Sequence, residues 1–287
     1  MNELTNPQCD RFVPDGKTEA EALKRTTHLA IVTHQDDLEI LAYHGIKECY
    51  QKSDRWFTGI VVSDGAGSVR AGAYANFTDE QMKAVRREEQ REAASLGEYS
   101  AVYQLDYPSA ALKSEKFKAS IESDLYSLLA ESRPEHVYLH NPADSHDSHV
   151  SVFLRSIAAL RALPEADRPR AIWGCEVWRD LDWLSPADKK LLPVSEYPDL
   201  AKKLCAVFDS QVSGGKRYDL ATIARRQAHA TFSASHEVDR ETAITLAVDL
   251  TPLIREPAAD IGEFTMKMID RFKEDVKIRL GKFQWKS

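Results

Sequence analysis

Short, nearly continuous apolar runs alternate along the chain with longer stretches whose apolar residues recur every three or four positions. The runs predict strands at residues 28–33, 56–63, 100–105, 136–140 and 171–178. They lack polar alternation, which is typical of strands buried on both faces, as in a parallel sheet. Strands that alternate with helices predict an α/β fold, a three-layer sandwich with a mostly parallel sheet.

Helical periodicity and capping residues place the helices between and after these strands. Thr18 and Glu21 have the spacing of a capping box, so a short helix is expected over residues 18–25. A long charged helix should begin at Thr78 and end before Gly97. Another helix should begin at Asp36 or Asp37, either of which could cap it. The remaining predicted helices cover 119–132, 150–163, 199–210, 220–234, 240–254 and 261–279.

No linker divides the sequence, so residues 1–287 are expected to form one domain. Residues 1–26 would be an N-terminal arm, 181–198 a loop, and about 196–287 a helical C-terminal extension. The apolar fraction of 43% is that of an ordinary globular protein with a sizeable core. Domains of this class commonly reach this length.

Charge and cysteine usage narrow the partners and the compartment. The net charge of −7 argues against nucleic acid, which requires a clustered positive surface. The four cysteines lie far apart without CxxC spacing, which favours a reduced, cytoplasmic protein. No signal peptide and no run of about 18 apolar residues is present, so no membrane span is expected. Whether the chain forms a homo-oligomer is left open.

Two segments carry candidate chemistry, and each follows a predicted parallel strand. His34-Gln35-Asp36-Asp37 comes directly after the first strand, and Asp144-Ser145-His146-Asp147-Ser148-His149 follows the fourth. In open α/β sheets, ligands bind beyond the carboxyl ends of the strands, so the two segments could meet there. The bland alternatives are a helix cap with a solvated histidine for the first segment and a polar loop for the second. Their joint occurrence favours a metal site.

We expect His34, Asp37 and His149 to be metal ligands. Two imidazoles and one carboxylate leave open positions on a divalent ion, as in hydrolytic zinc sites. Asp36 would then be free to take a proton from water, and His146 could donate to the developing oxyanion. Zn²⁺ is the expected ion, with another divalent ion such as Fe²⁺ as the alternative.

The order and spacing of these motifs resemble those of the PIG-L/LmbE-like N-acetylglucosaminyl deacetylases, roughly over residues 28–160. The resemblance rests on residues 33–37, on Arg86-Arg87-Glu88-Glu89 and on residues 141–149. It implies a Rossmann-like fold with a catalytic zinc ion that removes acetyl groups from N-acetylated amino sugar conjugates, releasing acetate and a free amine. It also implies His34, Asp37 and His149 as ligands, Asp36 as general base and His146 as the group that stabilises the oxyanion.

Substrate contacts are less well defined by the sequence. The family's substrate-binding arginine falls on Arg86, with Arg87 as the alternative. The acidic residue usual after the third strand is replaced by Ser109, so Asp106 is the candidate there, although a turn role is an alternative. Further candidates for substrate contacts are Glu176 and its neighbours Trp178 and Arg179. The alternative is that these residues pack at the edge of the sheet.

Three features outside these assignments also allow more than one interpretation. Residues 213–218 could hold an anion or simply join two helices, and His140 could support a ligand. The usual proline of the first motif is Gln35, and its usual glutamate is replaced by Leu38, with Glu39 one place later. Two functional alternatives also stay open: an inactive sugar- or nucleotide-binding module, and a metal hydrolase of another amide or ester.

Overall fold

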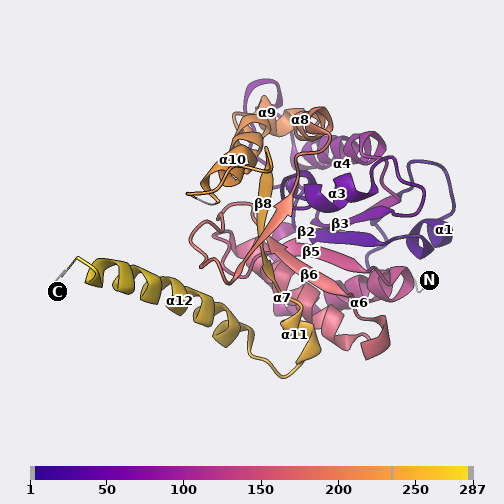
Figure 1. The fold of residues 1–287 in the computed structure, drawn as a ribbon. Coiled ribbons are helices and arrows are strands. Elements are labelled where there is room, and N and C mark those ends of the chain that lie inside the picture. Colours follow the sequence, from indigo (N-terminus) through magenta and orange to yellow (C-terminus); the bar gives the residue numbers. More distant parts are fainter. Residues whose placement is uncertain (1–3, 234, 284–287) are drawn as a thin grey trace.

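A continuous mixed sheet forms the centre of the protein in the computed structural model, which describes residues 4–233 and 235–283 (Figure 1). Its strands lie in the order β1-β4-β3-β2-β5-β6-β8-β7. The strands are β1 (Asp10–Phe12), β2 (His28–Val32), β3 (Phe57–Ser63), β4 (Ala101–Tyr107), β5 (His136–His140), β6 (Ala171–Cys175), β7 (Lys189–Pro193) and β8 (Ile244–Asp249). The central strands β4-β3-β2-β5-β6 are parallel, which confirms the five predicted strands.

The chain reverses its direction of travel across the sheet between β2 and β5. From β2 it proceeds through β3 to β4, then crosses to β5 and β6 on the other side of β2. His28 lies opposite both Phe57 and His136, so the three strands are in register and end at the same edge. A crevice opens beyond the strand ends at such a switch point, which is where α/β proteins bind ligands. Both candidate segments emerge there.

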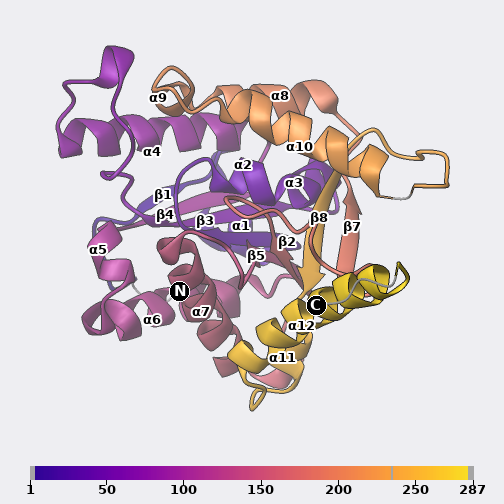
Figure 2. The ribbon, with the colours of Figure 1, turned by 90° about the vertical axis from the view of Figure 1, so that its left-hand side faces the viewer.

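Helices cover both faces of the sheet, as expected for three layers (Figure 2). One face carries α2 (Asp37–Leu41), α3 (Tyr43–Cys49), α4 (Asp79–Leu96), α8 (Pro198–Ala206), α9 (Asp209–Val212) and α10 (Tyr218–Phe232). On or beside the other face lie α1 (Glu19–Lys24), α5 (Ser109–Leu112), α6 (Glu115–Ser132), α7 (Asp147–Ala162) and α11 (Pro252–Arg255). Short 3-10 turns lie at η1 (Gly72–Tyr74) and η2 (Glu165–Asp167). The two buried apolar clusters therefore sit on opposite faces of the sheet.

Local capping signals set the helix boundaries where the sequence predicts them. Thr18 and Thr78 each cap a helix through a capping box, and α4 ends at Gly97. Asp36 occupies the N-cap position of α2, but its side chain makes no capping hydrogen bond, so the predicted capping role is wrong. The single helix expected to begin at Asp36 or Asp37 is instead divided at Ala42 into α2 and α3.

The largest errors of the sequence interpretation concern the C-terminal third. The predicted helix over 240–254 instead contains β8, which pairs antiparallel with β6 and β7, and is helical only from Pro252. The predicted loop over 181–198 contains β7, and the N-terminal arm contains β1, an antiparallel edge strand on β4. The extension after residue 196 is therefore not purely helical. A short apolar run fits either element, and here the open edge of β6 selects the strand.

The last helix, α12 (Ile261–Gly281), projects from the body of the protein beyond α11 (Figure 1). Its first half is anchored, with Met268 buried and Phe272 in edge contact with Trp183. Within the described ranges, no helix combines the length and the apolar character needed to cross a membrane.

Candidate metal centre and active site

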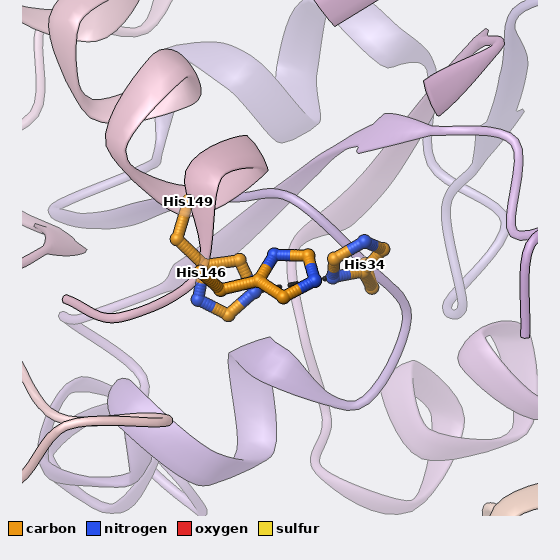
Figure 3. A group of neighbouring side chains, drawn as sticks. All are labelled: His34, His146 and His149. Carbon is orange, nitrogen blue, oxygen red and sulfur yellow. Dashed lines mark hydrogen bonds between the residues drawn. The ribbon is translucent and has the colours of Figure 1, made fainter. Parts of the chain in front are cut away.

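Three side chains from the two candidate segments converge at the sheet edge. His34 follows β2 and Asp37 begins α2, while His149 lies in the first turn of α7. His34 Nδ1 lies 3.2 Å from His149 Nε2 and 3.3 Å from Asp37 Oδ2, and His149 Nε2 lies 3.4 Å from the same carboxylate oxygen. Figure 3 shows His34 and His149 with these ring nitrogens directed at one another. The structure thus brings the three predicted ligands together.

The spacing of this triangle of donor atoms fits a four-coordinate ion. Ligand atoms about 2.0–2.1 Å from a tetrahedral Zn²⁺ lie about 3.3–3.4 Å from one another. The three edges here measure 3.2, 3.3 and 3.4 Å. Three donors also leave one position open, as in catalytic rather than structural zinc sites. By geometry and by donor chemistry, the residues fit a divalent metal.

His140 and Asp144 support His149 from behind. The rings of His140 and His149 stack with centroids 3.9 Å apart, and Asp144 Oδ2 lies 3.5 Å from His149 Nδ1. The backbone N–H of Thr33 donates to His140 Nε2 over 3.0 Å. A carboxylate on the far nitrogen of a liganding histidine orients the ring and raises its basicity. His140 also forms a group with Asp37 and His149 that could hold a metal, as do His34, His146 and His149.

The carboxylates at this centre are buried but differ in protonation. Burial by itself would raise the pKa of Asp37, yet His149 and the ring of His34 hold it below its ordinary range. For Asp36, burial dominates over the attraction of Arg86 and raises the pKa to about 6. Asp37 is therefore a permanent anion suited to a cation, while Asp36 is a stronger base than an ordinary aspartate.

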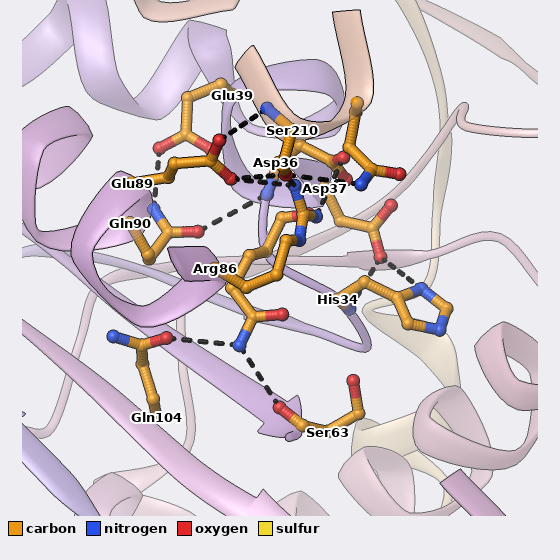
Figure 4. Close-up of polar contacts among 12 residues, drawn as sticks. His34, Asp36, Asp37, Glu39, Ser63, Arg86, Glu89, Gln90, Gln104 and Ser210 are labelled. Carbon is orange, nitrogen blue, oxygen red and sulfur yellow. Dashed lines mark hydrogen bonds and ion pairs between the residues drawn. The ribbon is translucent and has the colours of Figure 1, made fainter. Parts of the chain in front are cut away.

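Arg86 on α4 holds Asp36 in place (Figure 4). Its guanidinium donates to Asp36 Oδ2 over 2.9 Å and to the backbone oxygen of Gln35. It also pairs with Glu89 at 3.3 Å, and Glu89 accepts hydrogen bonds from the backbone N–H and the hydroxyl of Ser210. Only 1% of the Arg86 side chain is exposed. A chain of contacts thus joins Asp36 to α9, far along the sequence.

The backbone of Asp36 is strained, because its φ of 86° lies in the left-handed region that non-glycine residues rarely adopt. Its N–H donates to Gln90 Oε1 over 3.3 Å, and Gln90 Nε2 donates to the buried carboxyl of Glu39 over 2.9 Å. Tyr99 also donates to Glu39, whose pKa burial raises to about 8. Glu39, which lies one place after the usual glutamate of the motif, is therefore part of the network that supports the backbone of Asp36.

A cavity of about 530 Å³ opens above the metal centre. His34, Asp36, Asp37 and His146 line its floor. The ring of His146 lies with its centroid 5.2 Å from that of His34 and 4.6 Å from that of His149 (Figure 3). Desolvation, followed by the neighbouring rings, lowers the pKa of His146, so the neutral imidazole is favoured near pH 7 and can still donate one N–H.

The predicted substrate-binding residues have different environments. Arg86 lines the cavity, where it donates a hydrogen bond to Asp36. Asp106 pairs with Arg87 at 3.0 Å and does not line the cavity. Glu176 does not line the cavity either. It is buried, and its carboxylate accepts hydrogen bonds from the backbone N–H groups of Leu181 and Leu246 and contacts His229. The cavity wall instead includes Trp178 from the same loop.

Sequence reasoning missed several groups that complete the site. Asp144 lies within the second motif and could have been found from its spacing to His149. Gln90 and Ser210 carried no sequence signal, because amide and hydroxyl residues are common on helices. Lys216 and Tyr218 both line the cavity. They lie in the segment 213–218, whose sequence fits either an anion site or a helix connection.

Comparison with known proteins shows what the stretch that contains this site is similar to. Residues 29–160, which contain both motifs, match the family model described as PIG-L: GlcNAc-PI de-N-acetylase. This stretch is similar to the PIG-L family. The match begins in β2 and ends in α7, so it covers four of the five parallel strands, all but β6, and every residue of the donor triangle. No curated protein sequence matches the chain significantly.

Solved structures share the fold of this stretch and of much of the chain around it. The 4-carboxy-2-hydroxymuconate hydratase GalB from Pseudomonas putida KT2440 is 17% identical, with a TM-score of 0.60, over 78% of this chain and 96% of that one. The N,N'-diacetylchitobiose deacetylase from Pyrococcus horikoshii is 16% identical, with a TM-score of 0.59, over 81% of this chain and 88% of that one. The A40926 pseudoaglycone deacetylase Dbv21 is 18% identical, with a TM-score of 0.57, over 78% of this chain and 97% of that one. Because one fold carries both a hydratase and deacetylases, the fold alone does not select the reaction.

Proposed function

We propose that the protein is a metal-dependent N-deacetylase that removes the acetyl group from an N-acetylated amino sugar conjugate. The observation that carries the proposal is the donor triangle of His34, Asp37 and His149, with the carboxylate of Asp36 beside it on the cavity floor. The match of this stretch to a de-N-acetylase family model and the deacetylases among the structural relatives support it.

In this proposal His34, Asp37 and His149 would hold the ion, with zinc as the expected metal. When bound, the ion supplies a Lewis acid that polarises the acetamide carbonyl and acidifies water. Asp36 takes a proton from the attacking water, and its raised pKa of about 6 leaves it mostly ionised yet basic at pH 7. Arg86 holds this carboxylate in one orientation.

His146 donates an N–H to the carbonyl oxygen as that oxygen gains negative charge. Asp36 then passes its proton to the nitrogen, the C–N bond breaks, and acetate and a free amine leave. Both groups lie on the floor of the same cavity, so they can act on one bound acetamide.

The test is acetate release from N-acetylglucosamine conjugates by the purified full chain, with its metal content measured. Replacing Asp36 by Asn should lower turnover by roughly 10²–10⁴ and leave metal content unchanged, since general base catalysis contributes about that much. The exposed Asp54, replaced by Asn, is the matched control and should retain full turnover. Full turnover by the Asp36 variant, or a protein that binds no divalent ion, would refute the proposal. Reloading the apoprotein with Zn²⁺ or Fe²⁺ identifies the active metal.

The compartment and partners are part of the same proposal. Cys49, Cys175 and Cys205 are buried free thiols, which supports a reducing compartment such as the cytoplasm. The acidic net charge supports a small-molecule substrate rather than nucleic acid.

A further inference from the structure

The outer wall of the cavity is built by residues that the proposed chemistry does not use. Trp178, in the loop after β6, is 44% exposed, and its ring faces that of His146 at a centroid distance of 6.2 Å and an interplanar angle of 18°. Tyr218, at the start of α10, meets the edge of Trp178 at 6.2 Å. Lys216 Nζ lies 5.2 Å from the Trp178 ring centroid. All three residues line the cavity and lie outside the stretch that matches the PIG-L family model.

A tight turn after α9 places Lys216 at this wall. Its backbone N–H donates to the carbonyl of Gln211 over 2.9 Å. Gly214 packs so closely against α9 that an added Cβ would lie 2.3 Å from the carbonyl oxygen of Ser210. Ser210 is in turn held by Glu89, the partner of Arg86. The same contacts that orient the general base therefore also set the position of Lys216.

The ammonium of Lys216 has no carboxylate partner among the described residues, whereas the next cation along the chain does. Arg217 forms an ion pair with Asp219 at 2.7 Å and points away to the surface. Lys216 instead lies over an aromatic face, where the attraction is weak because the site is partly exposed. A charged oxygen from a ligand would bind it more strongly, through a charge-assisted hydrogen bond.

The charged side chains around the cavity also favour an anionic ligand. Of the described residues that line it, the carboxylates are Asp36 and Asp37, and both belong to the metal centre. A second lysine, Lys113, also lines the wall and has only a loose contact with the exposed Asp147 at 3.8 Å. In a chain of net charge −7, an outer cavity whose charged side chains are lysines selects for negative charge in the ligand.

We propose that Trp178, Lys216 and Tyr218 form a subsite for a negatively charged substituent, a carboxylate or a phosphate, on the amino sugar conjugate. Trp178 offers its face to the sugar ring, and Lys216 binds the anionic oxygen, with Lys113 adding positive charge. The volume of about 530 Å³ accommodates an amino sugar with such a substituent. This inference rests on the proposed deacetylase function and names its substrate class.

The test compares three substrates of the purified, metal-loaded full chain: methyl, carboxymethyl and phosphate derivatives at C1 of N-acetylglucosamine. The expected result is a kcat/KM at least tenfold higher for one or both charged substrates than for the methyl glycoside. Lys216→Gln should lower that preference about tenfold, mainly through KM. Lys202→Gln, on the exposed face of α8, is the matched control and should keep the preference. The two charged substrates show whether a carboxylate or a phosphate is preferred.

Equal kcat/KM for charged and neutral substrates, or a preference that survives Lys216→Gln, would overturn the subsite while acetate release still upheld the deacetylase. If no substrate releases acetate, the deacetylase proposal fails, and calorimetry with N-acetylglucosamine 1-phosphate decides the subsite by itself. Binding tighter than that of the methyl glycoside and weakened by Lys216→Gln would support it, and equal binding would refute it.

Discussion

Replacing Arg86 by Met tests whether the buried guanidinium holds Asp36, the proposed general base. Its side chain is 1% exposed and forms two ion pairs, with Asp36 at 2.9 Å and with Glu89 at 3.3 Å. Removing one partner of a buried pair costs about 3–5 kcal/mol, because the remaining charge is left uncompensated. A domain of ordinary stability has about 5–15 kcal/mol in total, so the variant should remain folded but be clearly destabilised.

The cost should depend on pH in a defined direction. Burial already raises the pKa of Asp36 to about 6 and that of Glu89 above its ordinary value, in spite of Arg86. Without the guanidinium both values rise further. A group with a raised folded-state pKa favours folding at low pH, and this stability is lost as pH rises from the unfolded to the folded value. The variant should therefore lose less stability at pH 5 than at pH 8.

Urea unfolding at the two pH values measures this effect, since the shift in midpoint at constant slope gives the change in free energy. Arg87→Met is the matched control on the same helix. Its side chain is 32% exposed and forms one pair, with Asp106, so its loss should cost at most about 1 kcal/mol at either pH. A cost for Arg86→Met below that of the control, or one that is larger at pH 5, would refute the assignment.

Two further predictions concern stability. Burial, and then nearby positive groups, lower the pKa of His28 to about 3 and that of His44 to about 4. The free energy of unfolding should therefore fall as pH drops below 6.5, because these histidines bind protons only when the chain is unfolded. His28→Asn should flatten this pH dependence in urea titrations between pH 7 and pH 5. An unchanged slope would contradict the burial argument. Gly214→Ala should destabilise by about 1–3 kcal/mol because its Cβ meets the Ser210 carbonyl, whereas Gly281→Ala, with open space around it, should cost nothing in the same thermal melts.

The sequence by itself predicted the parallel half of the sheet and the residues that converge at the candidate metal centre. Continuous apolar runs from β2 to β6 reflect burial on both faces, and this burial is recorded residue by residue in the chain. His34, Asp37 and His149 could be chosen because each follows a strand end, and strand ends of a parallel sheet share one edge. Caps at Thr18 and Thr78 were predictable because they depend on contacts three residues away.

Only the tertiary structure decided what depends on partners distant in sequence. The apolar run of β8 fits a helix equally well until the edges of β6 and β7 are available to pair with it. Burial of Arg86, the support of Asp36 by Gln90, and the placing of Lys216 beside Trp178 join segments that lie from about 40 to more than 120 residues apart. Local sequence cannot encode such contacts, because each side chain acquires its charge state and orientation only from the neighbours that folding brings to it.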